Sequence, residues 1–230
     1  MELFVDKHIT KNRLSPYLKR SNNNLKKALA LYEVNIAYSS ELYKLLSILE
    51  ISLRNHINER CIKLLGNDWI TNIKYDVHLH ILNSFHNTNE NYVITKNTFT
   101  VMEKIFSIQE NMIADTIERL KDENKPITND YLVSRSLFSF WTRLFNKAYE
   151  ATLWNKSLAT IFNKQLTRNK AEQTLNEFRW LRNRIAHNGC VIDMKYSPEM
   201  YCNKILKLLE IIDPKLSIWS NKQVDMSLLG

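Results

Sequence analysis

The chain has 230 residues with only three glycines and four prolines, and its formal net charge is +8. So few glycines exclude turn-rich β architectures, which need many residues that tolerate positive φ angles. No stretch reaches the ~18 apolar residues of a membrane-spanning helix, and the N-terminus lacks a secretory pattern. We therefore expect a cytosolic all-α protein whose basic surface attracts a polyanion, either nucleic acid or, as the rival, an acidic membrane surface.

The N-terminal part of the chain contains the longest helical pattern. Ser15-Pro16 is typical of a helix start, and the asparagines at 22–24 can cap the next helix. From residue 25 apolar side chains recur every three or four positions up to Gly66, a natural residue just beyond a helix end. The pattern leaves open whether this is one helix or two helices broken near Ser39-Ser40.

The middle of the chain predicts shorter elements. Residues 67–97 are rich in Asn and Thr with weak periodicity, so we expect short elements and connections there. A helix is expected over residues 98–122. Thr128 is a suitable N-cap for a helix through residues 132–145, and another helix is expected through residues 149–161.

The last third of the chain predicts two further helices. The first begins near Arg168 and stops at Gly189, and a final helix starts at Pro198 and is ended by Pro214. No internal repeat or low-complexity linker separates one part of the chain from another. We therefore expect a single helical domain over residues 1–230.

The most informative stretch is Arg182-Asn183-Arg184-Ile185-Ala186-His187-Asn188. Here alone an arginine precedes a histidine with four to six residues between them. Arg182 falls on the apolar side of its helix, beside Phe178, where a charge is costly unless it is paired or used. On an ideal helix His187 lies about 140° around from Arg182. The two can meet if Gly189 lets the last turn unwind, or if a second copy supplies the partner across a two-fold axis.

This arginine and histidine are suited to cutting RNA. Histidine can act as base or acid near neutral pH, and the arginine fork matches phosphate oxygens. Attack by the substrate's own 2′-hydroxyl needs no metal. Two structural interpretations stay open: His187 can cap its own helix, and Arg182 can pair with Glu50, which can instead pair with Arg54.

Several short motifs of the chain resemble those of one protein family. They are Leu31-Tyr32-Glu33-x-Asn35, Leu49-Glu50-x-x-Leu53-Arg54-Asn55, Gly66-x-x-Trp69, Phe140-Trp141-x-x-Leu144-Phe145, Leu153-Trp154 and Leu181-Arg182-Asn183-Arg184-Ile185-Ala186-His187. In combination they resemble the Abi-like family of bacterial abortive-infection proteins over about residues 15–195. The last motif is similar to the Arg-x4-6-His hallmark of the HEPN superfamily, helical bundles that often act as dimeric, metal-independent ribonucleases.

The resemblance implies a HEPN-like helical bundle with an elaborated N-terminal half, followed by a C-terminal helical extension over residues 196–230. It places Arg182 and His187 on the family's catalytic arginine and histidine, and Asn183 on the polar position after the arginine. It implies a homodimeric endoribonuclease of a phage-defence or toxin–antitoxin system, restrained by an RNA or protein antitoxin. Members often carry a second histidine or an acid where this chain has Asn188-Gly189. The alternative is a non-catalytic RNA-binding or scaffolding protein.

The remaining candidate residues are assigned supporting roles. Segment 156–184 holds seven Lys or Arg and two acids, a net charge of +5, and its RNA-binding candidates are Arg168, Lys170, Arg179 and Arg184. Asn183, Glu50 and Arg54 are expected to support the site. We expect no metal or cofactor site, because no Cys/His spacing typical of zinc occurs and the histidines at 78, 80 and 86 are interpreted as a chance grouping. The tryptophans at 69, 141, 154 and 180 are expected to serve packing.

Overall fold

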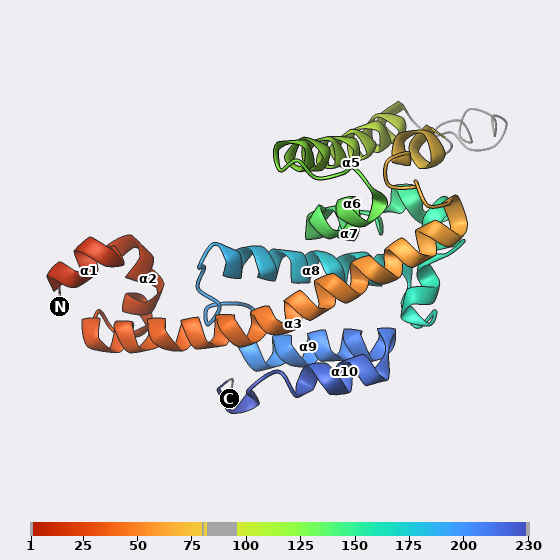
Figure 1. Cartoon of the computed structure of the whole chain (residues 1–230). Coiled ribbons are helices and arrows are strands. Elements are labelled where there is room, and N and C mark those ends of the chain that lie inside the picture. Colours follow the sequence, from red (N-terminus) through yellow and green to blue (C-terminus); the bar gives the residue numbers. More distant parts are fainter. Residues whose placement is uncertain (1, 80, 82–95, 229–230) are drawn as a thin grey trace. The chain divides into compact units, whose positions relative to one another are not determined.

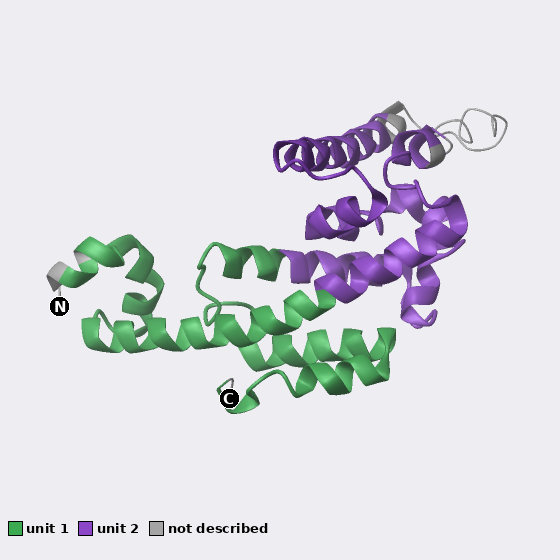
Figure 2. Ribbon diagram, viewed as in Figure 1, with its two compact units in different colours: residues 1–49, 180–230 green, residues 50–179 purple. Residues whose placement is uncertain are grey.

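The computed structural model describes residues 2–79, 81 and 96–228, and every regular element in these ranges is helical (Figure 1). The predicted all-α fold is thus confirmed, while the HEPN-like arrangement stays a prediction. None of the helices in these ranges has both the length and the apolar content to traverse a bilayer. The chain divides into two compact units, residues 1–49 with 180–230 and residues 50–179 (Figure 2).

The first unit combines the two ends of the chain. It contains α1 (Glu2–His8), α2 (Lys11–Arg20), the first part of α3 (Leu25–Leu65), the end of α8 (Arg168–Ala186), α9 (Pro198–Ile212), α10 (Pro214–Asn221) and the 3-10 helix η5 (Met226–Leu228). Leu14, Tyr17, Ala28 and Cys190 are buried together in its core. Helices α9 and α10 lie side by side (Figure 1).

The second unit contains the middle of the chain. Its elements are the rest of α3, the π-helix η1 (Ile73–Leu79), α5 (Lys96–Asp122), α6 (Asn129–Arg135), α7 (Phe138–Arg143), the 3-10 helix η2 (Lys147–Tyr149), the π-helix η3 (Glu150–Trp154), the 3-10 helix η4 (Leu158–Phe162) and the first part of α8. Trp69 packs against Phe140 and Trp141, with ring centroids 6.4 and 6.1 Å away, and all three are fully buried. This confirms the packing role predicted for Trp69 and Trp141.

Helix α3 is one continuous helix through Ser39-Ser40, which settles the alternative that the sequence left open. It begins after Asn24, whose side-chain oxygen accepts a hydrogen bond from the Lys27 amide at 3.0 Å. It ends at Gly66, which has φ +95°, a conformation that suits glycine. The predicted cap and stop of this helix are confirmed.

The predicted start of a helix at Ser15-Pro16 is wrong. Helix α2 begins at Lys11, because the Thr10 side chain accepts a hydrogen bond from the Arg13 amide at 3.4 Å and so caps the helix earlier. Pro16 lies inside α2.

The helix predicted through residues 132–145 is two helices, α6 and α7, interrupted at Ser136-Leu137. The Ser136 hydroxyl donates to the Leu132 carbonyl at 2.7 Å, and both interrupting residues have extended backbone, with ψ 140° and 152°. Hydroxyl bonding to a carbonyl one turn earlier competes with helix continuation.

The helix predicted through residues 149–161 is also wrong, because this stretch forms η2, η3 and η4 instead. The Asn146 side chain accepts from the Ala148 amide at 3.1 Å and starts a 3-10 turn. The apolar residues of the stretch are nevertheless buried, so their spacing reflects core packing more than one regular helix.

At the C-terminal end the start of α9 at Pro198 is confirmed, but α9 is not the final helix. Asp213 ends α9, and its carboxylate accepts from the Lys215 amide at 2.7 Å. Pro214 therefore ends one helix and occupies the first turn of the next, α10.

Candidate functional site

Helix α8 ends in a hydrogen-bonded turn that carries His187. The Gly189 amide donates to the Arg184 carbonyl at 2.7 Å and the Asn188 amide to the Ile185 carbonyl at 2.8 Å, the pair of bonds that defines a Schellman motif. Asn188 takes the left-handed position with φ 53°. Helix α8 therefore ends at Ala186, shortly before the predicted stop at Gly189, and its last turn stays wound.

Gly189 is needed for a different reason, which is space. A Cβ atom on Gly189 would lie 2.6 Å from the Arg184 Cγ atom and 2.9 Å from the Arg184 carbonyl oxygen. Both distances are too short for a side chain of any size. Glycine at this position therefore lets the chain fold back tightly against α8.

Three side chains fix the backbone of this turn. Arg13 Nη1 donates to the carbonyls of His187 at 3.2 Å and of Asn188 at 2.8 Å. Asn35 donates to the Gly189 carbonyl at 3.4 Å and accepts from the Val191 amide at 2.6 Å. Arg184 Nε donates to the Cys190 carbonyl at 2.7 Å. These bonds come from α2, α3 and α8, so three helices determine where the His187 backbone lies.

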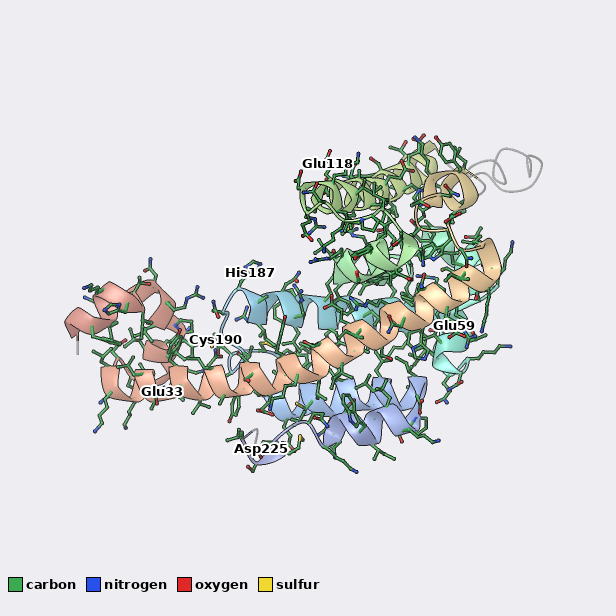
Figure 3. The ribbon with its side chains drawn as sticks, viewed as in Figure 1. Glu33, Glu59, Glu118, His187, Cys190 and Asp225 are labelled. Atoms are coloured by element: carbon green, nitrogen blue, oxygen red, sulfur yellow. The ribbon has the colours of Figure 1, made fainter. Side chains whose placement is uncertain are left out.

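The two predicted catalytic side chains differ in exposure. Arg182 is half-buried, whereas His187 and Asn183 are exposed, and Figure 3 places His187 at the end of α8. Leu181 and Ile185 are buried on the core side of α8. A helical spacing of five residues separates Arg182 from His187 by well over a quarter turn. One copy of α8 therefore presents the guanidinium and the imidazole to different sides.

Arg184, a predicted RNA-binding residue, has contacts within the chain. Its guanidinium lies 5.3 Å from the centroid of the Trp180 ring, and its Nε atom holds the Cys190 carbonyl. Trp180 itself is 50% exposed, so the packing role predicted for it does not lie in the core. The contacts favour a role for Arg184 in shaping the turn.

Two hollows lie on either side of Asn188. The first, which we name the α3 groove, has a volume of about 460 Å³ and is lined by Tyr32, Asn35, Ile36, Ser39, Ser40, Tyr43, Ile185, Ala186 and Asn188. The second has a volume of about 340 Å³ and is lined by Thr10, Asn12, Arg13, Pro16, Tyr17, Asn188 and Cys190. Both hollows therefore border the turn that carries His187.

The predicted RNA-binding residues of the second unit fall into two groups. Lys170 is exposed, as a phosphate contact requires. Arg168 is buried, donates to the Phe145 carbonyl at 2.7 Å and forms ion pairs with Glu172 and Glu150. These contacts favour a structural role for Arg168 over RNA binding.

Arg179 lies half-buried beside Arg143. Burial, and then repulsion by Arg143, lower the pKa of Arg179. Arg143 Nε is shielded from solvent without a hydrogen-bond partner, and neither arginine forms an ion pair within the described part of the chain. Two neighbouring guanidinium groups without a carboxylate are suited to an anionic ligand.

Glu50 and Arg54 lie in the second unit, where both line a pocket of about 260 Å³ together with Arg119, Glu123 and Arg135. Arg54 Nη1 donates to the Ser134 carbonyl at 3.1 Å, which ties α3 to α6. Pairing of Glu50 with Arg182 or with Arg54 stays a prediction.

His78 is a buried core residue of the second unit. Its Nδ1 atom lies 2.8 Å from Glu110 Oε1, its Nε2 atom lies 3.0 Å from the Tyr149 hydroxyl, and its ring stacks on Phe106 at 4.3 Å. Burial lowers the pKa of His78 more than Glu110 raises it. His80 and His86 lie outside the described residues, and the described ones contain no cluster of three or more metal-ligating side chains.

The sequence did not identify Arg13 as part of the site. Arg13 and His187 are 174 positions apart, and an arginine in a short helix carries no local signal of its partner. Asn35 could have been found, because it is a buried polar residue beside an apolar stripe and such residues need partners.

Comparison with protein-family models, with curated proteins and with solved structures finds no match to this chain. The resemblance to Abi-like and HEPN proteins therefore rests on the motifs quoted from the sequence.

Proposed function

We propose that this protein is a cytosolic, metal-independent endoribonuclease of a phage-defence or toxin–antitoxin system. The observation that carries the proposal is the end of α8, where an exposed His187 stands on a turn held by Arg13 and Asn35, five residues after a half-buried Arg182. An accessible imidazole on a fixed backbone is what proton transfer to a bound substrate requires.

The proposed site is composite and is formed by two copies of the chain. Arg182 and His187 project to different sides of one α8, so a two-fold axis beside the end of α8 would bring the arginine of each copy to the histidine of the other. Asn183 is exposed on the same turn of α8 and is the nearest supporting candidate. Glu50 and Arg54 stay supporting candidates.

The proposed reaction cleaves a phosphodiester bond by transesterification. The 2′-hydroxyl oxygen attacks the adjacent phosphorus while a neutral His187 imidazole takes its proton. Arg182 stabilises the added negative charge on the phosphorane oxygens. The bond from phosphorus to the 5′-oxygen breaks, and the protonated His187 of the second copy gives that oxygen its proton. The products are a 2′,3′-cyclic phosphate and a 5′-hydroxyl.

The second unit offers further candidate contacts to an RNA backbone. Lys170 is exposed, and Arg143 and Arg179 form a pair that lacks an anion within the described residues. A restraining RNA could use the same basic segment 156–184, in which case its binding would weaken steeply with salt.

The experiment is RNA cleavage in excess EDTA. Wild-type protein is expected to cut single-stranded RNA, not the matching DNA, and to leave a 2′,3′-cyclic phosphate. His187→Ala is expected to abolish cutting with unchanged circular dichroism and dimer mass. His8→Ala, which removes another exposed histidine, serves as the matched control and is expected to keep full activity.

The alternative is a non-catalytic RNA-binding or scaffolding protein, and the charge of segment 156–184 favours it equally. A protein that shifts RNA in a gel but releases no cleavage product under any ionic condition would establish this alternative.

A further inference from the structure

The α3 groove has a shape set by small residues between two large ones. Tyr32, Ile36, Ser39 and Tyr43 recur every three or four positions, so they face one side of α3. Ser39 and Ser40 lie between the two tyrosines and leave the surface hollow there. The Tyr32 ring packs edge-on against Tyr17 at 5.4 Å, which gives the groove a fixed wall.

The lining of the α3 groove contains no charged side chain. It offers phenol and serine hydroxyls, the amides of Asn35 and Asn188, and aliphatic groups, a combination that suits a flat neutral ligand with hydrogen-bonding edges. The Asn35 amide is already occupied by Gly189 and Val191. The hydroxyls of Ser39 and Ser40 form no hydrogen bond within the described residues, so they are available to a ligand.

The groove lies on the side of α8 that carries the predicted phosphate-binding arginine. Its lining residues Ile185 and Ala186 follow Arg182 by three and four positions, so all three share one side of the helix. One helical turn is 5.4 Å, comparable with the distance from a nucleobase to its own phosphate group. A nucleotide whose phosphate meets Arg182 can therefore reach the groove with its base.

We propose that the α3 groove binds one nucleobase of the RNA strand, stacked on Tyr43 and hydrogen-bonded at its edge by Ser39 and Ser40. Tyr43 is 43% exposed at the rim of the groove, which leaves a ring face for stacking. This inference rests on the proposed ribonuclease function and adds a consequence to it, because cleavage becomes selective for the base at one position beside the scissile phosphate.

The test uses DNA oligonucleotides that contain a single ribonucleotide, so that only one bond can be cut. The ribonucleotide base and the base that follows it are varied among all four, and kcat/KM is measured for each substrate. Wild-type protein is expected to prefer one base at one of these positions. Replacing both serines with alanine, Ser39→Ala with Ser40→Ala, is expected to reduce that preference about three- to tenfold.

Two further pairs of variants test stacking on Tyr43 and access to the groove separately. Tyr43→Ala is expected to lower kcat/KM about tenfold, and Tyr43→Phe, which restores the ring, is expected to recover most of that loss. Ser40→Trp fills the groove and is expected to lower kcat/KM about tenfold or more. Ala30→Trp places the same side chain at an exposed position of α3 outside the groove and should leave kcat/KM unchanged.

The outcomes distinguish this inference from the proposed function. If wild-type protein cuts every substrate equally and Ser40→Trp cuts as fast, the groove inference is overturned while the ribonuclease proposal stands. If Ser40→Trp loses activity only because the dimer dissociates in light scattering, the groove is an interface between copies and the inference is likewise overturned.

A binding measurement covers the case in which wild-type protein cuts no RNA. The four nucleoside 3′-monophosphates are titrated into ¹⁵N-labelled His187→Ala protein. If the amide chemical shifts of residues 32–43 change by different amounts with different bases, the groove binds a base even though the protein is not a nuclease. Equal or absent shifts overturn the base site independently of catalysis.

Discussion

Gly189→Ala tests the tight turn that carries His187. The new Cβ atom would meet the Arg184 Cγ atom at 2.6 Å and the Arg184 carbonyl oxygen at 2.9 Å. The Arg184 side chain cannot swing away without losing its bond to the Cys190 carbonyl, and its own carbonyl accepts the Gly189 amide. Relief of the overlap therefore breaks contacts of the turn, which we expect to cost about 1–3 kcal/mol.

The cost of the Gly189→Ala substitution can be measured as a loss of global stability and as more frequent local opening of the turn. For a chain of this length we expect the Tm to fall by roughly 2–4 °C for each kcal/mol. Native-state hydrogen exchange should become faster at the amides of Gly189 and Val191, and RNA cleavage should slow because His187 loses its fixed backbone. Asn188→Gly is the matched comparison: it removes a side chain from a left-handed residue, so stability should stay the same or rise slightly. An unchanged Tm and unchanged exchange in Gly189→Ala would refute the close approach.

Three further predictions concern single side chains. Arg13→Met removes two hydrogen bonds to the turn, so exchange at the Val191 amide should accelerate by about tenfold while circular dichroism stays unchanged. His78 has a pKa below the ordinary value of 6.5, so at mildly acidic pH the unfolded chain binds a proton that the folded chain does not. The free energy of unfolding should therefore decrease as pH falls below about 6.5. Urea titrations of His78→Gln should show a weaker dependence of this free energy on pH. Lys170→Met should weaken RNA binding and lower its salt dependence without loss of stability, whereas Arg168→Met should destabilise by about 2–3 kcal/mol because it leaves buried acceptors without a donor. Equal stability of the last two variants in thermal melts would contradict the structural role of Arg168.

Several helix boundaries set by local capping were predictable from the sequence, although the Thr10 cap of α2 was missed. Asn24 and Gly66 mark the ends of α3, and Pro198 marks the start of α9, because each acts through its own backbone or a neighbour three residues away. The sequence predicted that α8 stops at Gly189, whereas α8 ends at Ala186 and Asn188 takes the left-handed conformation. Only the nearby Arg184 atoms show that Gly189 is needed for space.

Breaks within an apolar helical pattern, and contacts between distant parts of the chain, were not predicted. The apolar spacing through residues 132–145 matched one helix, yet Ser136 bonds the carbonyl of Leu132 and the chain turns there. Of the candidate site, the sequence proposed Arg182 and His187 but did not indicate Arg13, which holds the backbone at His187. Arg13 lies 174 positions from His187, beyond the reach of any local pattern.

The first unit is assembled from residues 1–49 and 180–230, with the whole second unit encoded between them. During synthesis the N-terminal helices leave the ribosome long before the segment that completes their core. Arg13 and Asn35 can form their hydrogen bonds to the turn only after residues 187–191 have been translated. A truncated nascent chain would thus lack the turn at His187 altogether. If the protein is a toxic nuclease, its activity begins only after residues 180–230 have been synthesised.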